Sequence, residues 1–95
     1  MLRSEMNAVL RRINNIQIEI DRCEKISDKA FVAGDKQKAD KREQMAYEKA
    51  LYRNGMIDAM AALGFRIEHG IIKDRKPNDP SIIWVVNEID ELKLR

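Results

Sequence analysis

The sequence has 95 residues, with 18 basic and 16 acidic side chains and a formal net charge of +2. This length suits a single domain and is too short for the deep cleft in which most enzymes hold a substrate, and the charge excludes a strongly basic arm or an acidic mimic of DNA. The single cysteine, the lack of a leader-like start and the lack of an apolar run near ~20 residues predict a soluble, cytoplasmic protein with no contact with membranes.

The first third of the chain has the apolar spacing of a helix that packs against another helix, because its members recur at alternating steps of four and three. We expect this helix at residues 4–33, with Ser4 as its N-cap. Gly34 should end it, since glycine enters the left-handed C-cap conformation without steric cost. The predicted seam consists of Leu2, Met6, Val9, Ile13, Ile16, Ile20, Cys23, Ser27 and Ala30.

A second helix with the same spacing is predicted at residues 35–63, capped by Asp35 and ended by Gly64. If the chain folds back at Gly34, residues equidistant from it face each other, as Ile16 and Tyr52 would. The second half of this helix is apolar on several sides, so we expect it to be covered on more than one face, and Gly55 to allow a close backbone contact. Its predicted seam is Met45, Lys49, Tyr52, Met56, Ala59 and Leu63.

Residues 65–87 predict a β-hairpin, because alternating and β-branched segments flank the turn sequence Lys76 to Pro80. We expect a loop of about seven residues and a bulge at Gly70; a shorter hairpin with a tight turn at His69-Gly70 is the alternative. Either Ile82, Trp84 and Val86 or the opposite pair Ile83 and Val85 should cover the second helix. A short helix is predicted at 88–94. The fold class is therefore α+β, a long antiparallel two-helix hairpin followed by a small β-hairpin and a short C-terminal helix.

The sequence offers little for catalysis. One His and one Cys cannot supply a structural zinc site, and its four glycines are isolated, so no phosphate-binding loop is present. We interpret Cys23 as a small core residue and His69 as a surface or half-buried residue. We expect no enzymatic activity, no cofactor and no bound metal.

Two groups of residues are candidates for partner binding. Ile18, Phe31 and Val32 fall outside the predicted seam, so the terminal sheet, a two-fold homodimer or a partner protein could cover them, or they could simply be exposed. Lys73, Arg75 and Lys76 lie on the predicted loop, and a helix followed by a basic hairpin loop resembles the wing of a winged-helix module. Asp74 and Asp79 dilute the charge of that loop.

The stretch from Ala46 to Phe65, AYEKALYRNGMIDAMAALGF, follows a helical arm ending in Ala-Gly-Asp and resembles short proteins encoded by bacteriophages and other mobile elements. Some such proteins are anti-CRISPR inhibitors, so the resemblance implies stoichiometric binding to a nuclease complex without catalysis. We therefore expect a non-enzymatic protein-binding module, most concretely a phage-type inhibitor whose partner is a CRISPR effector. The alternative is a small DNA-binding accessory protein that uses the basic loop. The expected contact residues are Ile18, Phe31, Val32, Lys73, Arg75 and Lys76.

Overall fold

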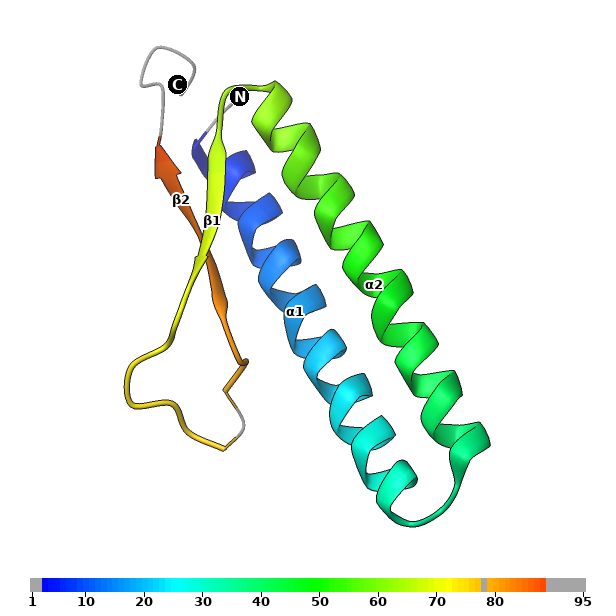
Figure 1. The fold of residues 1–95 in the computed structure, drawn as a ribbon. Helices are drawn as coiled ribbons and strands as arrows, with labels where there is room; N and C mark the ends of the chain where they lie inside the picture. The colour runs from blue at the N-terminus through cyan, green and yellow to red at the C-terminus, as the bar shows by residue number, and fades with distance from the viewer. Residues whose placement is uncertain (1–2, 78, 89–95) are drawn as a thin grey trace.

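The computed structural model describes residues 3–77 and 79–88. Two long helices, α1 (Arg3–Val32) and α2 (Lys36–Ala62), form an antiparallel hairpin, and two strands, β1 (Arg66–Gly70) and β2 (Ile83–Glu88), form an antiparallel sheet beside it (Figure 1). The α+β class and the predicted order of these elements are confirmed. Neither α1 nor α2 combines the length and the apolar character that a membrane span requires.

The turn between the helices is built as predicted. Gly34 has a φ of 83°, in the left-handed region, and the side chain of Asp35 accepts a hydrogen bond of 3.1 Å from the backbone N–H of Lys38. At the other end of α2, Gly64 has a φ of 92°. The helices are slightly shorter at these ends than predicted, because Ala33 and Leu63 belong to turns.

The predicted seam of α1 is confirmed from Met6 to Ala30, where it is buried apart from the half-buried Val9. Its first predicted member, Leu2, lies outside the described residues. The predicted seam of α2 is partly wrong: Tyr52 and Leu63 are 59% and 49% exposed, and Ala59 is exposed as well. The residues of α2 that are buried instead are Ala39, Ala46 and Met60. Two causes rotate the contact face of the helix: small alanines allow close approach near the turn, and Arg53 turns inward to meet polar partners on α1.

Two further predictions for α2 have different outcomes. A Cβ atom added at Gly55 would meet no atom within 4 Å, so the prediction that this glycine marks a close backbone contact is wrong. The apolar half of α2 packs on both α1 and β1, as predicted, although Leu51 is exposed. The sheet covers only the side that carries Met60.

The β-hairpin pairs Ile67 with Val86 and His69 with Trp84. The tight turn at His69-Gly70 is therefore wrong, and the register shift lies between Arg66 and Ile67 rather than at Gly70. The connection runs from residue 71 to residue 82, longer than predicted. The predicted helix 88–94 is wrong at its first residue, because Glu88 ends β2; its remaining residues lie outside the described part of the chain.

The sheet covers one half of the helical hairpin. Trp84 is buried and Ile82 and Val86 are half-buried, so the first of the two predicted faces is the one that points inward. The predicted partner helix is wrong, because β2 packs on α1 and it is β1 that packs on α2. We call the part under the sheet the covered half and the part nearer the turn the open half (Figure 1). The core of the covered half consists of Met6, Ile13, Met60, Phe65, Ile67 and Trp84.

Candidate interaction surface

A polar stripe on α1 holds β2 in place. The side-chain amide of Asn14 donates to the carbonyl oxygen of Trp84 at 2.9 Å and accepts from its backbone N–H at 2.7 Å. These are the two main-chain groups that a neighbouring strand would otherwise satisfy, so Asn14 closes the edge of β2 against further pairing. This role of Asn14 gives no signal in the sequence, because an asparagine outside an apolar seam looks like a solvated residue.

Gln17 joins three elements and is only 4% exposed. Its Oε1 accepts from Trp84 Nε1 at 3.0 Å and from Arg53 Nη1 at 2.7 Å, and its Nε2 donates to Asp21 Oδ1 at 3.1 Å. The Arg53 guanidinium also lies 5.0 Å from the centroid of the Trp84 ring, a cation–π distance. Every polar atom of the buried Gln17 amide therefore has a partner, and the sheet is locked to both helices.

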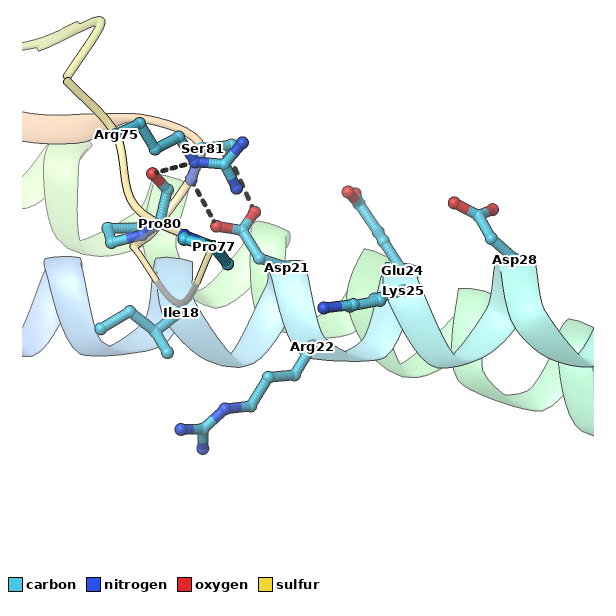
Figure 2. A pocket seen from close by; sticks show the side chains of 10 residues that line it. All are labelled: Ile18, Asp21, Arg22, Glu24, Lys25, Asp28, Arg75, Pro77, Pro80 and Ser81. Atoms are coloured by element: carbon cyan, nitrogen blue, oxygen red, sulfur yellow. Dashed lines mark hydrogen bonds between the residues drawn. The ribbon is translucent and has the colours of Figure 1, made fainter. Parts of the chain in front are cut away.

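Asp21 fixes the end of the connection between the strands. Its carboxylate accepts from the backbone N–H of Ser81 at 2.8 Å and from the Ser81 hydroxyl at 2.9 Å (Figure 2). Arg75 folds back inside the connection and donates to the carbonyl oxygens of Asp79 and Pro80, at 3.1–3.2 Å. The connection is thus tied to α1 at one point and braced internally by one arginine.

Beyond this point the open half carries a groove between α1 and α2, which we call the acidic groove. Its floor is made of small side chains, with the Ser27 hydroxyl donating to the carbonyl oxygen of Ala39 at 2.8 Å. Its walls include two aromatic residues, Phe31 and Tyr47, which are 72% and 60% exposed. Its charged residues, among those the structure describes, are all acidic: Glu24, Asp28, Asp40 and Glu43.

The carboxylates on α1 share one side of the helix. Asp21, Glu24 and Asp28 point to the same side, whereas Arg22 points away from it (Figure 2). Partial burial raises the pKa of Glu24, and the neighbouring charges of Asp21 and Asp28 raise it further, although Arg53 acts in the opposite direction. Burial is thus the largest cause of the raised pKa of Glu24, and the two neighbouring carboxylates add to it.

The structure does not bring the predicted contact residues together. Ile18 is half-buried and lines a hollow with Pro77, Pro80 and Ser81 of the connection, so the hairpin itself covers part of it (Figure 2). Phe31 forms a wall of the acidic groove. Val32 is exposed at the end of α1, about 100° around the helix axis from Phe31.

The predicted basic loop lies beside a surface of mixed charge. Lys73 and Lys76 are exposed, and Arg75 lines a hollow whose other charged residues are Asp21, Arg22, Glu24, Lys25 and Asp28.

The residues considered for catalysis occupy ordinary structural positions. Cys23 is buried in the core beside Ile20 and Ala46, as predicted. His69 is exposed on β1, as predicted, with its ring 5.0 Å from that of Trp84 in an edge-to-face arrangement. Within residues 3–77 and 79–88, no three His, Cys, Asp or Glu side chains are placed so that they could hold a metal ion.

Comparison with known proteins adds no relative: no family model, no curated protein and no solved structure matches the chain.

Proposed function

We propose that the protein is a non-enzymatic binding module and that the acidic groove is its protein-binding surface. The observation that supports this most is the exposure of Phe31 and Tyr47 on the walls of one groove. Large aromatic side chains are enriched where proteins bind each other, since they bury much area at low entropic cost. Scattered exposed apolar residues would need no such explanation, but these two share a surface with buried small residues between them.

A protein partner suits this surface better than a nucleic acid does. Phosphate groups would meet the carboxylates of Glu24, Asp28, Asp40 and Glu43, and affinity for nucleic acid depends on neutralising phosphates with cations. The alternative function, a DNA-binding accessory protein using Lys73, Arg75 and Lys76, stays a prediction. Retention on random duplex DNA at ~50 mM salt, lost by ~200 mM, would support that alternative.

The test of the binding function is capture from a bacterial lysate with three immobilised proteins: the natural chain, a Phe31→Asp, Tyr47→Asp variant and a Tyr52→Asp control. Tyr47 and Tyr52 are equally exposed on α2 but line different hollows, which makes the control a matched one. We expect a protein retained in stoichiometric amount by the natural chain and the control and lost from the groove variant. The same proteins on all three, or none on any, would overturn the proposal.

The more specific function, a phage-type inhibitor of a bacterial nucleic-acid-guided nuclease, rests on the resemblance of the stretch from Ala46 to Phe65 and stays a proposal. Its test is a titration of guided DNA cleavage with the purified protein. Inhibition that saturates near one chain, or one dimer, per nuclease complex is the expected result, and unchanged cleavage by all nuclease classes tested would contradict it. Light scattering on the isolated protein decides between monomer and homodimer.

A further inference from the structure

We propose that the acidic groove takes a cationic amphipathic helix, about three turns long, from its protein partner. The inference rests on the proposed function and narrows it to one chemical class of ligand. An amphipathic helix laid into a groove between two helices is a recurring mode of protein recognition, in which apolar anchors fill the groove and flanking charges fix the orientation.

The charges of the groove determine the sign of the charge that its ligand should carry. Four acidic residues and no basic residue are found among its described lining. Asp28, Asp40 and Glu43 form no ion pair within the described part of the chain, so their charges are available to a partner. A partner with Lys or Arg beside its apolar face would neutralise them, whereas an acidic partner would place like charges next to them, which weakens binding.

The arrangement along the groove determines the shape of the ligand. Glu24 and Asp28 are spaced four residues apart on α1, and Asp40 and Glu43 are spaced three apart on the antiparallel α2. Carboxylates therefore line both sides of the groove at helical intervals, which match a helix with cations at the same spacing on both flanks of its apolar face.

The free length of the groove determines how much helix it can hold. On α2 the lining of the groove runs from Ala39 to Ala50. This interval corresponds to roughly 16 Å at 1.5 Å per residue, or about three helical turns. The small floor residues Ser27, Ala39 and Ala46 leave room for the ligand's apolar side chains between Phe31 and Tyr47. The ligand would thus cover the open half of the hairpin in the way that the sheet covers the other half.

The probe is a helical peptide of about 14 residues, near the shortest length at which an isolated helix is stable in water. It has leucines on one face and lysines on both flanks, and a second peptide has glutamate at every lysine position. Affinities for both are measured by calorimetry at low and at ~0.5 M salt. We expect the lysine peptide to bind at least tenfold more tightly than the glutamate peptide, and salt to weaken it, because exposed charges are screened within a few ångströms at high ionic strength.

Two pairs of matched variants place the peptide in the groove. Asp40→Lys with Glu43→Lys reverses charge inside it, and Glu48→Lys with Asp58→Lys makes the same change in charge on exposed positions of α2 outside its lining. Tyr47→Ala removes an aromatic wall, and Tyr52→Ala is its equally exposed control. We expect each groove variant to bind the lysine peptide about tenfold more weakly and each control to change affinity less than about twofold. Far-UV circular dichroism checks that all four keep their helices.

The outcomes separate this inference from the proposed function. Suppose that both peptides bind with equal affinity and that Tyr47→Ala still weakens their binding. This outcome would overturn the inference that the ligand is cationic, but the groove would still be a protein-binding surface. Binding that the control variants weaken as much as the groove variants do, or no binding at all, would overturn the inference, while capture from lysate would still test the function independently. Dimerisation of the chain that is abolished by Tyr47→Ala would assign the groove to a second copy and overturn the inference too.

Discussion

The two halves of the helical hairpin are held together by different means. In the covered half, the large side chains of Ile13, Phe65 and Trp84 are buried, and Gln17 bonds to groups of α1, α2 and β2. In the open half, small residues bring the helices together and nothing described lies over them. The comparison teaches that the residues which contribute most to stability and those of the proposed recognition surface lie in different halves of the hairpin. Residues of the groove can therefore be substituted with little effect on folding.

The largest effect should come from Trp84→Ala, which removes a buried aromatic side chain from the covered half. We expect a loss of about 3–5 kcal/mol in the free energy of unfolding, because a cavity forms and Gln17 and Arg53 lose a partner. Tyr47→Ala, in the open half, should cost less than about 0.5 kcal/mol. Urea denaturation followed by far-UV circular dichroism measures both. Similar losses for the two variants would contradict the division into halves.

A smaller loss is expected from Gln17→Leu. The substitution keeps the volume roughly constant but leaves the buried Trp84 indole N–H and the Arg53 guanidinium without their shared acceptor. An unsatisfied buried donor costs about 1–3 kcal/mol, more for a charged group, so we expect a loss of about 2–3 kcal/mol. Gln44→Leu, at an exposed position, is the control. Trp84 is the only tryptophan, so its fluorescence reports directly on the covered half during unfolding.

Asp35→Ala tests what stabilises the open half, because Asp35 lies at the turn between the two helices. Loss of the hydrogen bond from the Lys38 backbone N–H should cost about 1 kcal/mol, as is typical of an N-cap. Asp40→Ala, one helical turn further on and without a capping role, should change stability little. If the thermal midpoints of the two variants agree, the cap contributes nothing measurable.

The smallest effect should come from Glu24→Gln. The folded protein binds the Glu24 proton more tightly than the unfolded chain does, because burial and then Asp21 and Asp28 raise the pKa of this carboxyl. Its charge therefore lowers stability as pH rises through the raised pKa, and has no such effect below the unfolded pKa of about 4. We expect a slight gain in thermal midpoint for Glu24→Gln at pH 7 that vanishes below pH ~4. The control Glu48→Gln should show no gain, and a loss at pH 7 for Glu24→Gln would contradict the sign.

The helical hairpin could be predicted from the sequence because its signals are local. Gly34 and Asp35 fix the turn, and the spacing of apolar residues in α1 fixes its buried face. The seam of α2 was harder to predict, because Arg53 turns inward to bond to Gln17, which lies 36 residues away in the sequence. A polar residue that is buried only by distant partners gives no periodic signal. The same holds for Asn14, whose partners on Trp84 lie 70 residues away.

The acidic groove was missed for a different reason. Along the chain its carboxylates alternate with cations, as in Glu24-Lys25, Asp28-Lys29 and Asp40-Lys41, and such alternation looks like a mixed, solvated surface. A helix turns each neighbour by about 100°, so alternation in sequence becomes separation in space. Plotting charges around the helix axes, with the two faces aligned at Gly34, would have found the groove.

The contacts between Asn14 and Trp84 also bear on how the protein is made. The two residues are 70 positions apart, and ribosomes add about 5–20 residues per second, so α1 waits roughly 4–14 s for the strand that closes over it. During that interval β2 does not yet cover Ile13 and its apolar neighbours. A nascent chain stalled before Trp84 is therefore expected to bind chaperones, and one stalled after Glu88 has emerged is expected to be released from them.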